Sequence, residues 1–209
     1  MYYGSKKVYL SLLGRDSVGK LSILERYINN SYIKDQFFDN YSRFNREEKY
    51  FHENEFYDSI DFFDDNTTGY DIFLQHYKFF LSGVLLIYSI TKRSSFEIIK
   101  DVVQIIETAI KDNEKRPIIY LVGNKIDMEI KREVSKEEAI DCCNQYNYKY
   151  FECSALTGHN IHEIFGYIAR DITERDLNFI QKNKSKKVNK FKLFNKMKKF
   201  AKGNKCLIF

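Results

Sequence analysis

A segment near the N-terminus carries the residue types that bind phosphate. It reads Gly14-Arg15-Asp16-Ser17-Val18-Gly19-Lys20 and stands between a short apolar run and a helical pattern. The glycines let backbone N–H groups curl around an anion, the start of the helix adds partial positive charge, and Lys20 can reach terminal phosphates. The segment therefore predicts a phosphate-binding loop. A plain glycine-rich turn with an exposed lysine is the alternative.

The position after Lys20 lacks an expected oxygen ligand. The phosphate-loop pattern places a Ser or Thr hydroxyl there, on Mg²⁺, but this chain has Leu21. Ser22 follows and is turned by about 100° around the helix axis, so it is not expected to substitute. We therefore expect weakened Mg²⁺ binding.

Two further motifs follow apolar runs and suit recognition of a purine base. The first is Asn124-Lys125-Ile126-Asp127, in which a carboxylate can accept the two N–H groups that guanine presents on one edge and adenine does not. The second is Cys153-Ser154-Ala155, which offers a backbone N–H to a base oxygen. For the first motif, a polar turn that caps a helix is the alternative interpretation.

The elements that position these motifs alternate along the chain. Apolar runs predict strands over residues 7–13, 60–63, 84–90, 118–122 and 149–153, and helical spacing predicts helices over 21–28, 95–111, 135–146 and 161–175. Residues 30–55 suit a long loop that enters an edge strand. This order predicts an α/β fold with a parallel sheet covered on both faces. The loops at 14–20, 64–70, 123–127 and 153–157 should then share one rim, at the carboxyl ends of the strands.

The charge of the chain is unevenly distributed. Residues 177–209 hold eleven lysines and no Asp or Glu, so 23 basic and 29 acidic side chains, a net charge of −6, remain in residues 1–176. The hydrophobic content of 44% excludes disorder for most of the length. We therefore predict one domain over residues 1–176 and a basic tail over 177–209.

The four cysteines match neither a disulfide framework nor paired metal-binding knuckles. Cys142, Cys143 and Cys153 are predicted to be core or helix residues, and His159 and His162 to lie at the surface. The first residues lack the apolar core of a signal peptide. These features together predict reduced thiols in a cytosolic protein.

The ordered set GRDSVGK, NKID and CSA resembles the Ras superfamily of small GTPases over residues 7–176. The stretches SFEII at 95–99, EEA at 137–139 and YFECSALTGHNIHEIF at 150–165 resemble its Ras and Rab members. The resemblance implies a P-loop GTPase G domain: a mostly parallel six-stranded sheet with helices on both faces. It also implies binding of GTP and GDP with Mg²⁺.

The resemblance further implies roles for individual residues. Lys20 and the loop amides would bind the β- and γ-phosphates, Asn124 and Asp127 would select guanine, Lys125 would pack over the base, and Ala155 would donate its N–H. Tyr32 either flanks the base or is an ordinary core or surface tyrosine. The full set of implied nucleotide contacts is Gly14, Arg15, Asp16, Ser17, Val18, Gly19, Lys20, Tyr32, Gly69, Asn124, Lys125, Asp127, Ser154, Ala155 and Leu156.

The chain departs from the family pattern on the hydrolysis side. No Thr lies between Lys20 and Thr67, where the family's first switch has one. In the second switch the metal-facing carboxylate is Asp64 in one alignment, and in the other Asn66 takes its place. Tyr70 replaces the glutamine that orients the attacking water, and a phenol cannot both donate to and accept from that water. Asp16 adds a side chain beside the γ-phosphate. We expect slow or absent GTP hydrolysis and fast nucleotide exchange.

The tail combines lysines with apolar residues at helical spacing, among them Phe191, Phe194 and Phe200. A solvated charged tail, a nucleic-acid patch and a membrane-surface segment are the three interpretations. Cys206-Leu207-Ile208-Phe209 reads as a CaaX box for a prenyltransferase, and the final Phe favours a geranylgeranyl lipid. One lipid needs a second signal, which a polybasic stretch supplies at an anionic membrane. We therefore expect a lipid anchor and no nucleic-acid partner.

These observations predict a guanine-nucleotide-binding switch at the cytoplasmic face of a membrane, with the plasma membrane favoured. Effector proteins would bind through residues 33–45 and 64–76. The alternative is a pseudo-GTPase scaffold at the membrane that does not cycle. The choice between Ras and Rab subfamilies stays open.

Overall fold

The computed structural model describes residues 6–32, 49–50, 56–62, 82–110 and 116–203 of the chain. The chain divides into two compact units, Met1–Ile172 and Thr173–Phe209. The sheet and the predicted site lie in the first unit. The predicted boundary between residues 176 and 177 stays a prediction.

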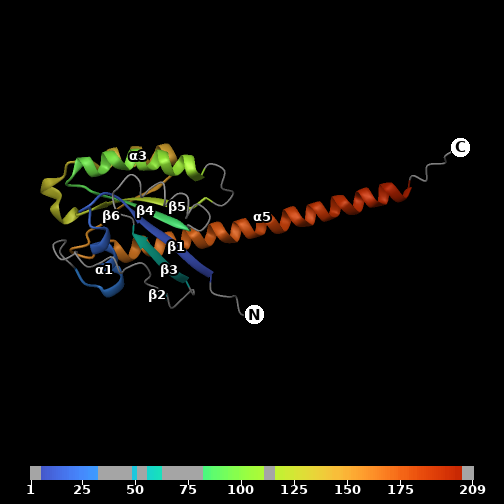
Figure 1. Cartoon of the computed structure of the whole chain (residues 1–209), viewed down its shortest axis with the longest axis horizontal. Helices are drawn as coiled ribbons and strands as arrows, with labels where there is room; N and C mark the ends of the chain where they lie inside the picture. The colour runs from blue at the N-terminus through green and yellow to red at the C-terminus, as the bar shows by residue number, and fades with distance from the viewer. Residues whose placement is uncertain (1–5, 33–48, 51–55, 63–81, 111–115, 204–209) are drawn as a thin grey trace. The chain divides into compact units, whose positions relative to one another are not determined.

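Strands and helices alternate along the first unit (Figure 1). The elements in chain order are β1 (Lys6–Leu13), α1 (Lys20–Asn29), β2 (Lys49–Tyr50), β3 (Phe56–Phe62), β4 (Gly83–Ser89), α3 (Arg93–Ile110), β5 (Ile118–Asn124), the 3₁₀ helix η2 (Ile126–Lys131), α4 (Lys136–Tyr146), β6 (Lys149–Glu152) and α5 (Ile161–Gly203). The six-stranded sheet has the order β2-β3-β1-β4-β5-β6. The pairing is antiparallel between β2 and β3 and parallel elsewhere, which confirms the predicted α/β fold.

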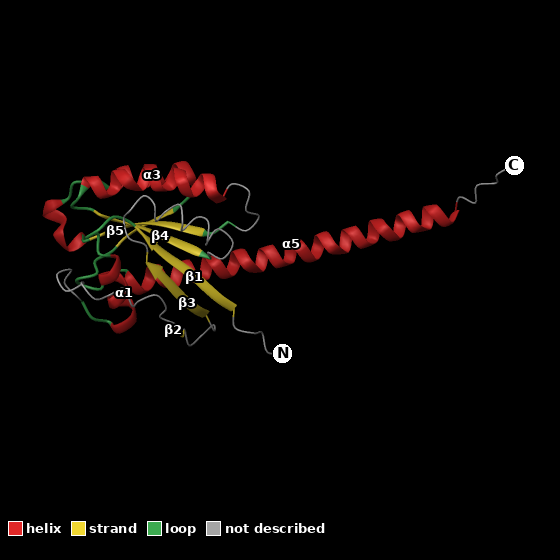
Figure 2. Ribbon diagram, in the orientation of Figure 1, coloured by secondary structure: helices red, strands yellow, loops and turns green. Residues whose placement is uncertain are grey.

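The sheet is covered on both faces, with α1 on one side and α3 on the other (Figure 2). Alternate residues of a strand point to opposite faces, and β4 follows this rule. Leu85 and Ile87 pack in a core cluster with residues of α1 and α5, whereas Leu86 and Tyr88 pack with residues of α3 and α4. Burial on both sides explains why β4 is a continuous apolar run.

Several predicted boundaries were wrong. β3 begins at Phe56, not at residue 60, because parallel pairing with β1 from Lys6↔Phe56 onward outweighs its polar residues. β5 runs to Asn124, since the ladder with β4 continues through Ser89↔Asn124. α3 begins at Arg93 instead of residue 95. α5 runs to Gly203 instead of residue 175. Residues 176–202 hold no glycine or proline and many lysines, which favour helix, and apolar residues at helical spacing recur from Phe191 onward.

None of the helices in the described residues combines the length and the apolar content that crossing a bilayer requires.

Candidate functional site

Three of the four predicted loops lie together at the carboxyl ends of the strands. Residues 14–20 follow β1, residues 123–127 include the last two residues of β5, residues 153–157 follow β6, and hydrogen bonds connect the three segments. The order of the parallel strands places the β1 end two strands from the β5 end. The fourth loop, 64–70, lies outside the described residues.

The loop from Gly14 to Lys20 passes close to neighbouring residues at both of its glycines. Gly19 is the N-cap of α1 with φ 96° and ψ 26°, and a Cβ there would clash with Asn124 Nδ2. A Cβ on Gly14 would clash with the Ile87 carbonyl oxygen. Both positions therefore require glycine, because the chain passes too close to its neighbours for a side chain.

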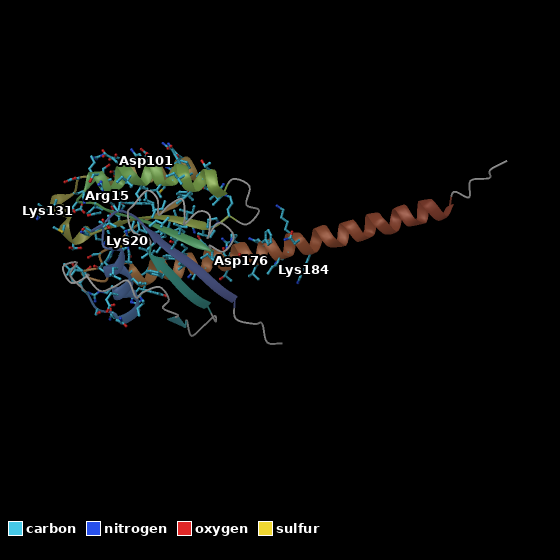
Figure 3. The ribbon with its side chains drawn as sticks, viewed as in Figure 1. Arg15, Lys20, Asp101, Lys131, Asp176 and Lys184 are labelled. Carbon is cyan, nitrogen blue, oxygen red and sulfur yellow. The ribbon has the colours of Figure 1, made fainter. Side chains whose placement is uncertain are left out.

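Lys20 begins α1, and its side chain folds back over the loop. Its ammonium donates to the Gly14 carbonyl and, at 3.4 Å, to the Arg15 carbonyl. Figure 3 labels Arg15, in the β1–α1 connection, and Lys20, the first residue of α1. The side chain of Leu21 carries no oxygen, and Ser22 is buried with 3% of its surface exposed. The residue after Lys20 therefore offers no hydroxyl to a cation.

Asn124 connects the Gly14–Lys20 loop, the phosphate-type loop, to residues 153–157, a base-type loop. Its Nδ2 donates to the Val18 carbonyl at 2.8 Å, and its Oδ1 accepts from the Ala155 N–H at 3.1 Å and from the Cys153 thiol at 3.6 Å. Only 1% of the residue is exposed. These bonds make Asn124 a connector between loops, and its direct contact with a base stays a prediction.

Asp127 presents its carboxylate at the surface. Its Oδ1 accepts from the Ser154 hydroxyl at 2.5 Å, and within the described part of the chain no other hydrogen bond reaches it. Lys125 has a left-handed backbone, φ 72°, and its ammonium donates to the Ser17 carbonyl at 2.6 Å. A carboxylate with one oxygen anchored and the other open suits a ligand edge that carries two N–H groups.

The Ala155 N–H is engaged within the protein, since it donates to Asn124 Oδ1. Donation to a base oxygen, which the family resemblance implies, would have to share or replace this bond. The adjoining turn is closed by the Gly158 N–H, which donates to the Ser154 carbonyl at 2.8 Å, and by the Thr157 N–H, which donates to the Ser154 hydroxyl. The turn is therefore well supported next to Ala155.

A half-buried chain of polar side chains supports the 123–127 and 153–157 segments from the α3 side of the sheet. The Tyr88 and Tyr150 hydroxyls lie 2.9 Å apart, Tyr150 donates to Glu152 Oε1 at 2.6 Å, and Arg132 NH1 donates to the same oxygen at 2.8 Å. Arg132 also pairs with Glu129 at 2.6 Å. Burial raises the pKa of both tyrosines, so they are neutral hydrogen-bonding groups at physiological pH. Arg132 thus fastens the residues after Asp127 to the strand that leads into Cys153.

Sequence reasoning missed Arg132, Glu152 and Arg26 as supports of the site. Arg26 lies in α1, yet its guanidinium bonds to carbonyls of Ala155 and Leu156. The partners are far apart in the chain, and no local spacing connects them. An alignment that shows paired variation would be the signal able to find them.

The remaining predicted residues fall into three groups. Asp16, Tyr32 and Leu156 are exposed, Tyr32 by 41% and Leu156 by 48%. Cys142, Cys143 and Cys153 are buried and His159 and His162 are exposed, as predicted. Outside the described residues lie Gly69, Tyr70, Asp64, Asn66, Cys206 and both effector segments, 33–45 and 64–76.

Comparisons with known proteins agree with this geometry. A model of the Ras family matches residues 9–174. Over 208 residues the chain is 32% identical to the Ras-like protein rasB of Dictyostelium discoideum, and the match covers 98% of each chain. It is 41% identical to Ras-related protein Rab-13 of Canis lupus familiaris over 91 residues, 43% of each chain, and 43% identical to Ras-related protein RAB1BV of Beta vulgaris over 94 residues, 44% of this chain and 42% of that protein. The match therefore spans less than half the length of these two Rab proteins. The chain belongs to the Ras family.

Proposed function

We propose that the chain is a membrane-anchored guanine-nucleotide-binding switch in signalling or vesicle traffic, with slow GTP hydrolysis. The observation that carries the nucleotide part is the convergence of three loops on Asn124, together with the exposed Asp127 carboxylate that accepts from Ser154. Titration with a fluorescent GDP analogue, with and without Mg²⁺, tests it. Saturable binding that GDP displaces at a far lower concentration than ADP is the expected result.

The residues of the chain divide the work of binding. The amides of the 15–20 loop and the Lys20 ammonium would hold the phosphates, and Lys20 would exchange its carbonyl partners Gly14 and Arg15 for phosphate oxygens. Asp127 would accept from the guanine edge. Mg²⁺, when bound, would neutralise charge on the β- and γ-phosphates.

Hydrolysis is expected to be slower than in a family member with the usual glutamine. Tyr70 stands at the water-orienting position and Asp16 beside the γ-phosphate, and positioning supplies most of the rate of phosphoryl transfer. Single-turnover assays with GTP and Mg²⁺ measure the rate. Replacing Tyr70→Gln should raise it by about tenfold or more, since an amide can both donate to and accept from the water.

Ile140→Gln provides the control, because it adds the same amide at an exposed position of α4, which contributes no residue to the proposed site. Hydrolysis by the unmodified chain at the rate of an ordinary family member would contradict the proposal. Acceleration of nucleotide release by EDTA to the same degree as in such a member would count against the weakened Mg²⁺ site.

The tail is proposed to place the chain at the cytoplasmic face of the plasma membrane. Cys206 would carry a geranylgeranyl lipid attached by a prenyltransferase, and the eleven lysines of residues 177–209 would bind anionic lipids. In cells, Cys206→Ser should move most of the protein from the membrane fraction to the cytosol. One lipid and the lysines each give only reversible attachment, so loss of either signal releases the chain.

Cys142→Ser is the matched control, since it removes a thiol that is buried in α4. Fractionation and fluorescence imaging give the readout. If the Cys206→Ser protein stays on the membrane at the level of the unmodified chain, the lipid anchor is absent or unnecessary.

A pseudo-GTPase scaffold is the second candidate function, and Leu21 is the observation that favours it. Without a hydroxyl at this position the Mg²⁺ site loses a ligand that the phosphate-loop pattern supplies. Tight GTP binding with no turnover over hours, and no gain in the Tyr70→Gln variant, would select the scaffold over the switch.

A further inference from the structure

The side chain of Arg26 joins two segments that border the proposed nucleotide site. Arg26 lies in the last turn of α1. Its Nε donates to the Ala155 carbonyl at 3.0 Å and its NH2 to the Leu156 carbonyl at 2.7 Å. The third nitrogen, NH1, donates to the Asn30 carbonyl at 2.8 Å. One guanidinium therefore fixes the peptide units beside Ala155 and the residue that ends α1.

The backbone on both sides is shaped to receive this guanidinium. Asn30 is the C-cap of α1 in a left-handed conformation, with φ 52°. Gly158 has φ 85°, and a Cβ there would lie 3.4 Å from Arg26 Cδ. The alkyl part of Arg26 thus packs against Gly158, and its guanidinium binds two carbonyls of the same 155–158 loop.

Arginine is the side chain that this arrangement requires. Three carbonyls in different directions accept from three different nitrogens, and a planar guanidinium presents five N–H donors in a fixed fork. A lysine ammonium is a point charge that reaches fewer of them at once. The contacts also provide a cation for the carbonyl end of α1, where positive charge is favourable.

From this geometry we propose that Arg26 is a positioning residue for the guanine base. It holds the 155–158 loop against α1 and, through Asn30, fixes the start of the segment that leads to Tyr32. The 155–158 loop and the segment that leads to Tyr32, which in this proposal border the base on two sides, are thereby fixed relative to each other. The inference rests on the proposed function, since it assumes that these loops face a nucleotide.

The test uses Arg26→Met, which keeps the alkyl length and removes all three donors. GDP affinity should fall by about tenfold, equal to about 1.4 kcal/mol, whereas ADP affinity should stay the same. Among the described residues, no hydrogen bond joins Arg26 to the Gly14–Lys20 loop, so binding through the phosphates should be preserved. The preference for GDP over ADP therefore drops by about the same factor. The GDP affinity of Arg26→Lys should lie between that of Arg26→Met and that of the unmodified chain.

Arg93→Met is the matched control. Arg93 donates to both Glu138 oxygens and to the Glu133 carbonyl, so the variant loses as many side-chain bonds, here from α3 to α4 and to the segment before α4. Its preference for GDP over ADP should not change. Thermal unfolding without nucleotide separates stability from binding, and Arg26→Lys carries the comparison if Arg26→Met does not fold.

The outcomes distinguish the two hypotheses. An unmodified chain that binds no guanine nucleotide overturns the proposed function and the positioning role with it. GDP binding by the unmodified chain with an unchanged GDP-to-ADP preference in both Arg26 variants overturns the positioning role alone. Equal weakening of GDP and ADP also overturns it, because that pattern marks a general structural role.

Discussion

Asn124→Asp should unfold at markedly lower denaturant concentration and lose most of its guanine-nucleotide affinity. The replacement keeps the shape of the side chain but changes the Nδ2 donor, 2.8 Å from the Val18 carbonyl, into an oxygen. Two acceptors would then face each other in a position that is 1% exposed. An unpartnered buried acceptor and a buried charge each cost free energy, together about 3 kcal/mol.

Urea unfolding monitored by circular dichroism measures the loss of stability, and GDP titration below the transition measures the loss of affinity. We expect affinity to fall by about a hundredfold or more, because the phosphate-type and base-type loops lose their connection. Asn144→Asp is the control, since Asn144 is exposed in α4. Wild-type stability in Asn124→Asp would show that the bond to Val18 carries little of the loop geometry.

Asp127→Asn is the second large effect, and it concerns the choice of base. A carboxylate accepts from both N–H groups of the guanine edge, whereas an amide in its place presents an NH₂ that meets one of them donor to donor. Hydrogen bonds to a charged group contribute about 1.5–3 kcal/mol each, so GDP affinity should fall by at least about a hundredfold. The Ser154 hydroxyl keeps its acceptor, the amide oxygen, so the fold should be retained.

A base with a carbonyl in place of the guanine amine would accept from the new NH₂. The variant should therefore bind xanthosine diphosphate better than GDP, which inverts the preference of the unmodified chain. Competition titrations with both nucleotides measure the ratio, and Asp101→Asn, exposed on α3, serves as the control. An unchanged ratio would remove Asp127 from the base-binding role.

The sequence predicted the loops of the site well because their position depends on short-range rules. The runs 84–90 and 118–122 are apolar throughout, which is typical of parallel strands buried on both faces, and β4 and β5 occupy them with small shifts. In a parallel sheet the carboxyl ends of the strands lie at one edge. The motifs that follow β1, β5 and β6 could thus be placed together before any coordinates were known.

The supports of the site could not be predicted in the same way. Arg26 contacts residues 129 and 130 positions away, and Arg132 contacts Glu152 across 20 positions. Nothing in the local pattern distinguishes these arginines from solvated ones. The internal use of Asn124 was likewise missed, because a motif specifies a residue type and not which of its atoms the protein itself will occupy.

The extent of α5 was missed for a different reason. Its end was predicted at residue 175, where the apolar spacing of residues 161–175 stops, but the helix continues through a lysine-rich stretch to Gly203. Periodicity reports which residues are buried against a neighbour. Continuation of a helix needs only residues that tolerate it, and no glycine or proline interrupts residues 176–202.

Three cysteines of the described residues are buried, and burial affects how readily their thiols are oxidised. Cys143 is 2% exposed and burial raises its pKa to about 12, while burial also raises the pKa of Cys142. Cys153, which bonds to Asn124, is fully buried, and burial with the nearby charges of Glu152 and Asp127 raises its pKa. Thiolates are the forms that peroxides convert to sulfenic acid. Cys153, the described thiol at the proposed nucleotide site, should therefore stay reduced in the presence of peroxides.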